Sequence, residues 1–364
     1  MRTLRQSPLR KRVSVTLFEP PGPVSGVCDD PELMVVHHHL MKLDPHGTRF
    51  ARVLRDTIDQ LLNGEATGRY DWATLFKTEK THAGTLVEIN LQREFEFNDG
   101  VDMDYRIEGI DVDCKYSQKF GSWMIPPEAE GHLCLLVWAD DYQSLWSAGL
   151  LRIQREWLNG GTNRDMKFTV KAEHRNNITW LWKDAVLPEN VLLHLPAATR
   201  ARILIPGKNK GQARVRELFR LVHGKRIGRG VVRTAAQQLD YMARVREGSK
   251  GRARPALRPY GIIILGDYQS HQAVARDLGG PVPAEGEFVA HRVVRARPEH
   301  SGLPQAEIGG ELWVVAQPGD AVEAAPQLPE AQEGSTRAAQ QRLLALEGHG
   351  ASLATPQQEE LDSD

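Results

Sequence analysis

Polar and apolar residues alternate without interruption on both sides of Glu108-Gly109, between residues 101 and 116. Alternation with a period of two is typical of a strand with one buried face, and a central glycine favours a tight hairpin turn. If Glu108-Gly109 form a two-residue loop, Asp104 lies directly opposite Asp113. The segment therefore predicts an antiparallel hairpin with one apolar and one charged face, so the fold must contain a sheet.

The opposed carboxylates of Asp104 and Asp113 repel each other and weaken a hairpin unless a cation lies between them. Such a cost marks a functional site, and carboxylate oxygens suit a hard cation, Mg²⁺ first. Lys115 projects from the same face as Asp113, where its ammonium can hold a scissile phosphate or orient a water. This D…D-x-K grouping resembles the active site of the PD-(D/E)xK nucleases. Two alternatives stay open: a strand face charged for solubility, and a bulge that shifts the register by one residue.

Glu88 precedes the hairpin in a segment, residues 81–94, that is predicted to be helical. Its apolar neighbours draw it toward the protein interior, where an acid needs a partner. A metal-bound water is one candidate partner, and a salt bridge with Arg93 or Lys80 is the other. Glu88 is therefore a candidate catalytic residue and, with Asp104 and Asp113, a candidate metal ligand.

A chain of 364 residues is expected to form about two domains with some extra length. Residues 1–26 contain five Lys and Arg and no acid before Val13, followed by a Pro- and Gly-rich stretch, which indicates a flexible basic arm. Residues 27–185 are predicted to be an α/β or α+β domain. Its helices are expected at 48–62 and 81–94, and its strands at 101–107, 110–116, 131–139 and about 146–153. A polar stretch from about 160 to 190 has only a weak pattern. Residues 187–318 form a second domain. The Ala, Glu, Gln and Pro-rich residues 319–364 predict a disordered tail, with a short helix at 336–346 as an option.

The basic residues are concentrated in the second domain. Residues 201–260 contain 16 Lys and Arg against 3 Asp and Glu, although the whole chain has a net charge of -1. Such a block indicates a polyanionic partner, nucleic acid first, with a solvated face or linker as the alternative. Helices at 212–222 and 229–246 around a short turn predict a helix-turn-helix, with the loop 248–258 and strand 261–265 as a wing. The alternative is an ordinary pair of helices. The candidate DNA-binding residues are Arg214, Lys225, Arg226, Arg229 and Arg233.

The apolar runs and the cysteines exclude several classes of protein. The longest apolar runs, residues 133–139 and 262–265, are far shorter than the roughly 20 residues that cross a bilayer. No apolar core follows the basic N-terminus, as a secretory signal requires. Three cysteines cannot form a disulfide framework and fit a reducing cytoplasm. The consecutive histidines at 37–39 point in different directions and do not converge on one ion.

Several longer motifs carry a family resemblance. They are Lys77-Thr78-Glu79-Lys80-Thr81-His82, Gly84-Thr85-Leu86-Val87-Glu88-Ile89-Asn90-Leu91, Val112-Asp113-Cys114-Lys115, Gly211-Gln212-Ala213-Arg214-Val215, Glu217-Leu218-Phe219-Arg220, Val222-His223-Gly224 and Gly261-Ile262-Ile263-Ile264-Leu265-Gly266. With these motifs the chain resembles the NaeI-type restriction endonucleases from about residue 43 to 320.

The resemblance implies a restriction-endonuclease-type nuclease domain joined to a winged-helix domain related to the catabolite activator protein fold. It implies a homodimer that makes a Mg²⁺-dependent double-strand cut in DNA, with a second copy of the recognition site held as an effector by the C-terminal domain. The family's catalytic glutamate, two aspartates and lysine fall on Glu88, Asp104, Asp113 and Lys115. The namesake's site, the palindrome GCCGGC, is the default expectation for the recognised sequence.

The chain also departs from the family. Leu61-Leu62-Asn63-Gly64 occupies the place of a ligase-like stretch in the namesake but has Asn in place of Asp, so no nucleotidyl transfer is expected. Divergence along the basic domain leaves effector binding and the exact site open. Two other functions are considered: a repair or recombination nuclease that recognises DNA structure, and a non-enzymatic winged-helix DNA-binding protein with a degenerate nuclease domain. The intact Glu/Asp/Asp/Lys set argues against the second.

Overall fold

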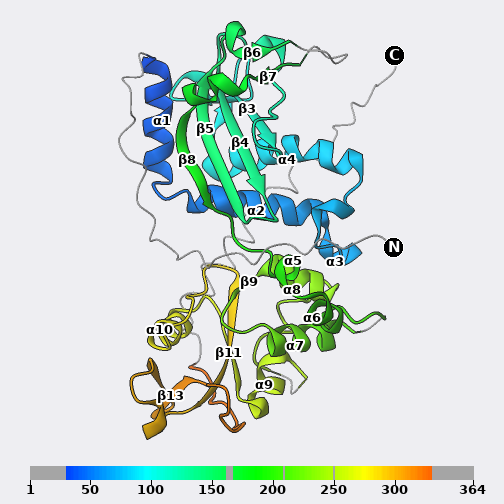
Figure 1. Cartoon of the computed structure of the whole chain (residues 1–364), viewed down its shortest axis with the longest axis vertical. Coiled ribbons are helices and arrows are strands. Elements are labelled where there is room, and N and C mark those ends of the chain that lie inside the picture. The colour runs from blue at the N-terminus through cyan, green and yellow to red at the C-terminus, as the bar shows by residue number, and fades with distance from the viewer. Residues whose placement is uncertain (1–29, 161–166, 208–209, 249–250, 330–364) are drawn as a thin grey trace, which may run out of the picture. The chain divides into compact units, whose positions relative to one another are not determined.

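The computed structural model describes residues 30–160, 167–207, 210–248 and 251–329 (Figure 1). The chain folds into two compact units. Of these residues, the first unit contains 30–54, 84–140 and 145–187, and the second contains 55–83, 141–144 and 188–329. The division passes through two helices, α2 (Thr48–Leu62) and α4 (Lys77–Phe95). The expected basic arm, residues 1–26, and the optional helix at 336–346 lie outside the described residues.

A six-stranded sheet organises the first unit. Its strands lie in the order β1 (Asn98–Asp99), β2 (Tyr105–Ile107), β3 (Ile110–Ser117), β4 (Leu133–Asp140), β5 (Leu145–Arg152) and β8 (Thr179–Val186). β3 and β4 are parallel and the other neighbours antiparallel. A short pair, β6 (Leu158–Asn159) and β7 (Thr169–Val170), forms a separate two-stranded sheet. This mixed α/β architecture with a large sheet is consistent with the expected restriction-endonuclease-like fold.

Aromatic side chains join the helices of the first unit to the sheet. Phe50 of α2 lies 4.8 Å from Phe95 of α4 and 4.8 Å from Trp182 of β8, between ring centroids, and is stacked on Trp146 of β5 at 5.9 Å. Large rings bury much apolar area at small entropic cost, so this cluster anchors α4, which carries Glu88, to the sheet. A further helix, α1 (Pro31–Leu43), contacts β5 and β8. It is capped by Asp30, whose carboxylate accepts the backbone N–H of Leu33.

The hairpin predicted around Glu108-Gly109 is confirmed. Both turn residues have positive φ, 51° and 80°, as the two-residue turns that match strand twist require. The pairs are Ile107 with Ile110, Arg106 with Asp111, and Tyr105 with Val112.

The ladder ends one residue short of Asp104, so the predicted backbone pairing of Asp104 with Asp113 does not form. The carboxylate of Asp111 accepts the backbone N–H groups of Val101 at 3.1 Å and Asp102 at 2.8 Å. These two bonds hold the segment before Asp104 in a bend, and a bent backbone cannot continue the strand.

The stretch from 160 to 190 contains β8, which its weak pattern did not predict. Asp184 has a φ of 52°, and the pairing of β8 with β5 shifts register near Ala148. A bulge breaks the two-residue alternation by which a strand is recognised in a sequence.

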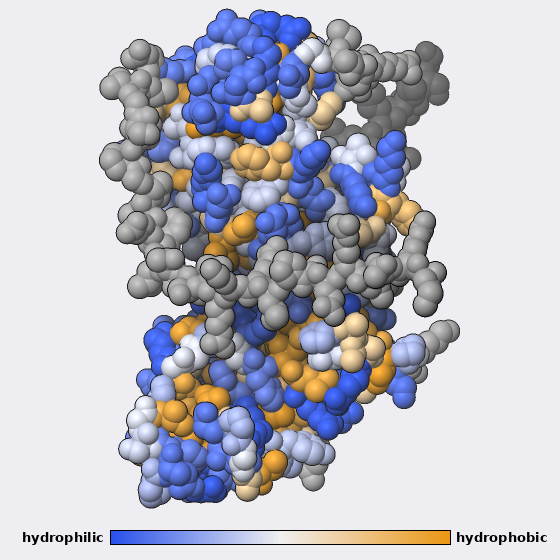
Figure 2. Space-filling model, viewed as in Figure 1, coloured by the Kyte–Doolittle hydropathy of each residue, from blue (hydrophilic) through white to orange (hydrophobic). Residues whose placement is uncertain are grey.

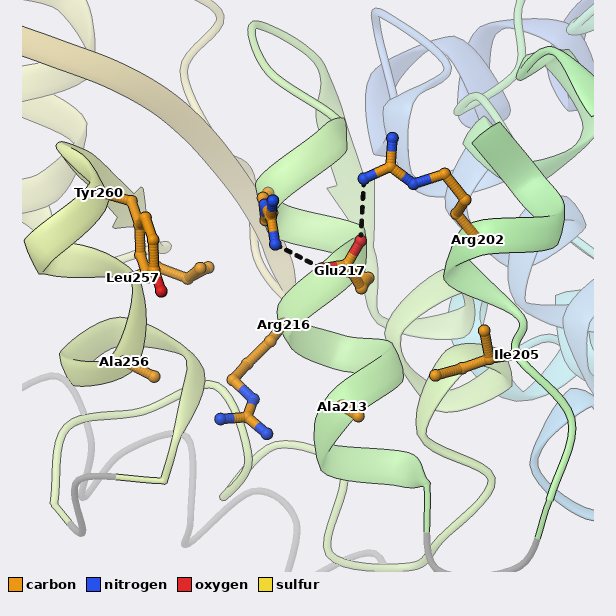
Figure 3. Close-up of a pocket in the computed structure, with 9 residues that line it drawn as sticks. Arg202, Ile205, Ala213, Arg216, Glu217, Ala256, Leu257 and Tyr260 are labelled. Atoms are coloured by element: carbon orange, nitrogen blue, oxygen red, sulfur yellow. Dashed lines mark hydrogen bonds and ion pairs between the residues drawn. The ribbon is translucent and has the colours of Figure 1, made fainter. Parts of the chain in front are cut away.

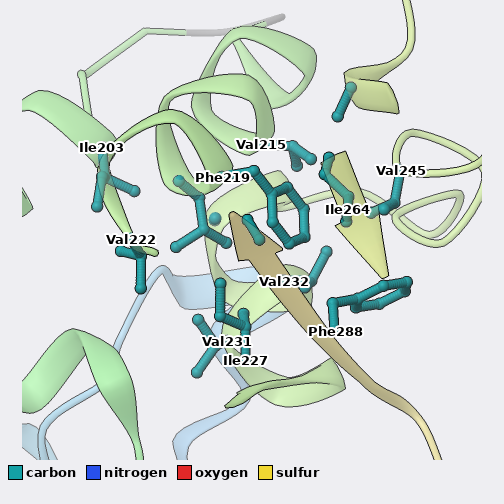
Figure 4. Packing of buried hydrophobic residues seen from close by; sticks show 14 of the residues in the cluster. Ile203, Val215, Phe219, Val222, Ile227, Val231, Val232, Val245, Ile264 and Phe288 are labelled. Atoms are coloured by element: carbon teal, nitrogen blue, oxygen red, sulfur yellow. The ribbon is translucent and has the colours of Figure 1, made fainter. Parts of the chain in front are cut away.

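The second unit packs helices against an antiparallel sheet. Its strands β10 (Ile262–Leu265), β11 (Glu287–Arg295), β13 (Glu311–Val315) and β12 (Gln305–Ile308) lie in that order, and β9 (Arg226–Gly228) also pairs with β11. Its helices are α3 (Gly64–Thr67), α5 (Val191–His194), α6 (Ala197–Ile203), α7 (Gly211–Leu221), α8 (Arg229–Ala236), α9 (Ala253–Leu257) and α10 (Gln269–Asp277). Phe219 of α7 meets Phe288 of β11 edge-on at 5.7 Å, in the core drawn in Figure 4. On the face seen in Figure 2, apolar residues gather at several places on this unit's surface.

Two predictions for this unit are corrected. The second helix of the predicted pair was expected at 229–246, but α8 ends at Ala236 because Gln237 takes a left-handed conformation. The tail was expected to be disordered from residue 319. Ala325 is instead buried and donates its backbone N–H to the Arg258 carbonyl at 2.8 Å, and Leu328 packs into the same apolar cluster. Among the described residues, no helix has the length and apolar character needed to span a membrane.

Candidate active site

Lys115 on β3 lies between two carboxylates. Its Nζ donates to Asp113 Oδ1 at 2.5 Å and to Asp104 Oδ2 at 3.3 Å, and also to the Cys114 carbonyl at 3.0 Å. Asp113 and Lys115 are two residues apart on one strand, so both side chains leave the same face. The structure therefore brings together three of the four residues that the sequence predicted, although the ladder does not reach Asp104.

Asp104 joins this group through its side chain. Its Oδ2 accepts the backbone N–H of Cys114 at 2.7 Å, where a continued strand would have supplied a carbonyl. The carboxylate thus replaces a lost ladder bond and is fixed beside β3 by a charge-assisted hydrogen bond.

Asp113 is buried, with an exposed fraction of only 3%, and does not lie on an exposed charged face. β3 is an interior strand, and β4 places Cys134 beside Asp113 in the parallel ladder. The Cys134 thiol donates to Asp113 Oδ2 at 3.4 Å. The alternative of a face charged for solubility is therefore wrong for Asp113.

Glu88 reaches the site from α4. The buried hydroxyl of Tyr105 donates to the Glu88 carbonyl at 2.8 Å and so ties this turn of α4 to the hairpin. The carboxyl of Glu88 is partly buried, and the charges of Asp104, Asp113 and Lys115 act on its pKa.

The cluster places several carboxyl groups close together where little solvent screens their mutual repulsion. Burial, followed by the charge of Asp104, raises the pKa of Glu88 to about 7, against the opposing effect of Lys115. Burial also raises the pKa of Asp113, although the ion pair with Lys115 opposes the shift. Burial alone would lower the pKa of Lys115, but Asp113 and Asp104 outweigh it and hold that pKa above its ordinary value. Lys115 is therefore an ammonium at neutral pH, and the acids carry an electrostatic cost that a further cation would relieve.

Comparison with known proteins decides the family. The family model "Restriction endonuclease NaeI" matches residues 34–324. The "Type II restriction enzyme NaeI" of Lentzea aerocolonigenes is 52% identical over 305 residues, which cover 82% of this chain and 95% of the relative. The chain belongs to the NaeI restriction endonuclease family. It is a restriction endonuclease, a hydrolase that binds DNA and cuts it at specific sites.

Type II restriction enzymes of this kind generally use divalent metal ions, and the donor set here fits one. Asp104 and Asp113 offer hard oxygen ligands that already converge on one cationic group, the ammonium of Lys115. Within the described part of the chain, no three His, Cys, Asp or Glu side chains are grouped closely enough to hold a metal by themselves. Two carboxylates are thus in place, and Glu88 lies beside them on a separate helix.

The predicted DNA-binding residues of the second unit lie in different surroundings. Arg214 is 5% exposed, and its guanidinium donates to the carbonyls of Ala235 at 2.6 Å and Ala236 at 3.1 Å, and to Ile205 and Gly207 at 3.3 Å. Four backbone carbonyls leave it no free donor face. The prediction that Arg214 contacts DNA is therefore corrected: it joins α7 to the end of α8.

The other four predicted DNA-binding residues each face an acid within the second unit. These ion pairs are Lys225 with Glu189 at 2.8 Å, Arg226 with Glu287 at 3.7 Å, Arg233 with Glu65 at 3.7 Å, and Arg229 with Asp56. All four cations keep a solvent-exposed side, so they remain able to contact a phosphate, but each must compete with its own acid.

Sequence reasoning missed two residues that support the site. Cys134 contacts Asp113 because β3 and β4 are parallel neighbours. Parallel strands are joined by a long connection, so the local sequence pattern does not predict their pairing. Tyr105 belongs to the apolar side of the alternation in residues 101–116, but the role of its hydroxyl depends on where α4 lies. Both are contacts between elements distant in the sequence.

Proposed function

We propose that this enzyme cuts both strands of DNA at a GC-rich palindrome, by default GCCGGC, as a Mg²⁺-dependent homodimer whose second unit binds another DNA copy as effector. The observation that carries the catalytic part is the position of Lys115, whose ammonium bridges Asp104 and Asp113. A palindrome presents two equivalent phosphodiesters, so a symmetric pair of sites matches its symmetry. The free thiols of Cys114 and Cys134 favour a reducing compartment, the cytoplasm.

The four residues have separable roles in this proposal. Asp104 and Asp113 would hold Mg²⁺, and Glu88 would be the third carboxylate of the site. Mg²⁺ when bound acidifies its water and neutralises charge on the phosphate. Lys115, an ammonium in the metal-free protein, would orient the water and the scissile phosphate. Glu88, whose pKa burial raises to about 7 in the metal-free protein, adds a third carboxylate beside Asp104 and Asp113.

The second unit's order of elements supports a winged-helix assignment. α7, β9, α8, α9, β10 and β11 follow one another in the chain, and β9 and β10 both pair with β11. Helix, strand, two helices and two further strands form a winged-helix arrangement, in which the second of the paired helices enters the DNA groove. In this assignment α9 and the basic residues before it replace α8 as the DNA-facing element, with Lys225, Arg226, Arg229 and Arg233 as flanking phosphate contacts.

A plasmid digest tests the catalytic proposal. With Mg²⁺, the purified enzyme should give discrete bands from a plasmid with two GCCGGC sites and none from a site-free plasmid. Lys115→Ala should abolish the bands, while Lys119→Ala, which removes an exposed lysine just beyond β3, should keep them. Discrete bands at other positions would replace the default site. Cleavage that follows DNA structure, such as branched junctions, would favour the repair-nuclease alternative.

A salt titration tests the effector role. Binding of the site by the catalytically silent Lys115→Ala protein should weaken by orders of magnitude between roughly 50 and 200 mM salt if the second unit contacts several phosphates. Affinity that does not change with salt would contradict DNA binding by the basic unit.

A further inference from the structure

A groove on the second unit combines an apolar floor with three arginines (Figure 3). Its volume is about 470 Å³. The apolar lining comes from Ile205, Ala213, Ala256, Leu257 and Tyr260, and the arginines are Arg202, Arg216 and Arg220. None of these eight residues is among the five that the sequence predicted to bind DNA.

The groove is electrostatically unbalanced. Glu217 is the one acid among the described residues that line it, and it accepts from Arg202 at 3.4 Å and Arg220 at 3.1 Å. Arg220 also lies over the half-exposed ring of Tyr260, 5.8 Å from its centroid. Arg216 makes no hydrogen bond or ion pair with any residue in the described ranges. An arginine without an acid beside an apolar floor suits an acidic segment that also carries an apolar side chain.

The last described stretch of the chain runs beside this groove. The Ala325 N–H donates to the carbonyl of Arg258, which lies in the 3₁₀ turn between the groove residues Leu257 and Tyr260. Four residues later, the Pro329 carbonyl lies 3.2 Å from Nε2 of buried His271, whose other nitrogen lies 3.4 Å from Arg254 of α9. The chain therefore leaves the described region at His271 of α10, which in turn contacts Arg254 of α9, the helix that supplies Ala256 and Leu257.

We propose that the acidic C-terminal segment, residues 347–364, docks in this arginine groove. Residues 330–364 contain seven acids and two arginines, and the final Glu359-Glu360-Leu361-Asp362-Ser363-Asp364 places a leucine among four acids. A random-coil linker of about 30 residues spans about 30 Å on average. This distance is about twice the radius of gyration of a domain of this size, roughly 14 Å. A tethered segment experiences a millimolar effective concentration, so weak contacts suffice to fill the groove.

Docking makes the tail a competitor of DNA. This consequence rests on the proposed DNA-binding role of the second unit, because four carboxylates beside Arg216 repel a phosphate backbone that approaches the same surface. If docking is about tenfold favourable, the tail weakens DNA binding by the second unit about tenfold at low salt. The docking itself requires no DNA and is tested without it.

Zero-length cross-linking of the full chain tests docking. Arg216→Lys keeps the positive charge and supplies an amine that a carbodiimide joins to a carboxylate in contact with it. We expect an amide between that position and Glu359, Glu360, Asp362 or Asp364, lost in 1 M NaCl, where charges are screened beyond roughly 3 Å. The matched control is Arg246→Lys, an exposed basic position outside the groove. Equal cross-linking from both positions, or none from position 216, would overturn the proposal.

DNA affinity then separates docking from its consequence. The variant E359Q/E360Q/D362N/D364N should bind a duplex about tenfold more tightly than the parent at low salt, and the gain should vanish in an Arg216→Ala background. A gain of the same size in that background would overturn competition through the groove. Cross-linking without DNA binding by any variant would contradict the effector function and leave the docked tail supported.

Discussion

The two units use charge in opposite ways. Around Lys115 the first unit gathers more acids than cations in a partly buried cluster, and raises the pKa of Glu88 to about 7 and that of Asp113 above its usual range. The second unit instead gives nearly every predicted DNA-binding cation one acid of its own, as in the pair of Arg229 with Asp56. A buried excess of one charge, which shifts pKa values, indicates a catalytic site. A cation that is paired with an acid gives no such indication, and a sequence does not show which acid each cation meets.

The largest expected effect comes from removing charge in the unbalanced cluster. Asp113→Asn should reduce the single-turnover rate of DNA cleavage by roughly 10³-fold or more, because it takes away a charged oxygen ligand at the reacting phosphate. DNA binding in Ca²⁺ should change little. The matched change in the balanced unit, Glu287→Gln, frees Arg226 and should leave the cleavage chemistry intact. Comparable rate losses for both variants would remove the distinction between the units.

Arg214 provides the largest expected effect on stability. Arg214→Ala should destabilise the protein by about 3 kcal/mol, because it leaves buried carbonyls of α8 without donors. Arg216→Ala, two residues along the same helix, should cost less than about 0.5 kcal/mol, because its side chain is partly exposed and has no partner in the described ranges. Urea denaturation of both variants measures the difference. Equal stability would mean that Arg214 does not join α7 to α8, and its assignment to DNA would reopen.

The catalytic cluster was predictable because most of its determinants are local. The alternation around Glu108-Gly109 sets the hairpin, and the two-residue spacing of Asp113 and Lys115 sets their common face. The burial of Asp113 was not predictable, because it depends on the parallel pairing of β3 with β4. The end of the ladder before Asp104 depends on the Asp111 side chain, which competes for backbone donors.

The ion-pair partners of the basic residues could not be predicted from the neighbouring sequence. Arg229 pairs with Asp56, 173 residues away in the chain, and Arg233 with Glu65. A count of 16 basic residues against 3 acids in residues 201–260 could not include acids supplied from residues 56 and 65. Helix 48–62 was predicted with its observed bounds. The spacing of its apolar residues does not show which side chains contact its polar face.

Glu88 in the first unit and His271 in the second should contribute to the pH dependence of stability with opposite signs in metal-free protein. The raised pKa of Glu88 means that the folded state binds more protons than the unfolded state between about pH 4.5 and 7, so its contribution to stability falls as pH rises. Burial, followed by Arg254, lowers the pKa of His271 to about 4, so its contribution falls as pH decreases from 6.5 to 4.

Variants isolate these contributions from other titrating groups. Relative to the parent, His271→Gln should flatten the rise of the unfolding free energy between pH 4 and 6.5, by up to about 1.4 kcal/mol per pH unit. Glu88→Gln should remove a decline between pH 4.5 and 7, and this change should be smaller because Glu88 is only partly buried. Urea titrations in EDTA at several pH values measure both slopes, and slope changes of the same sign would refute the contrast.

The smallest predicted effect concerns the contact that brings α4 to the hairpin. Tyr105→Phe keeps the buried ring but removes the hydroxyl that donates to the Glu88 carbonyl, which should cost about 1 kcal/mol of stability. Because that bond holds the turn of α4 that carries Glu88, the cleavage rate should fall further than stability alone explains, roughly tenfold at a temperature where the protein is fully folded. Tyr260→Phe, which removes the hydroxyl of a half-exposed ring in the second unit, is the control and should change neither quantity. An unchanged rate for Tyr105→Phe would mean that other contacts of α4, such as the stacking of Phe50 on Trp146, are sufficient to position Glu88.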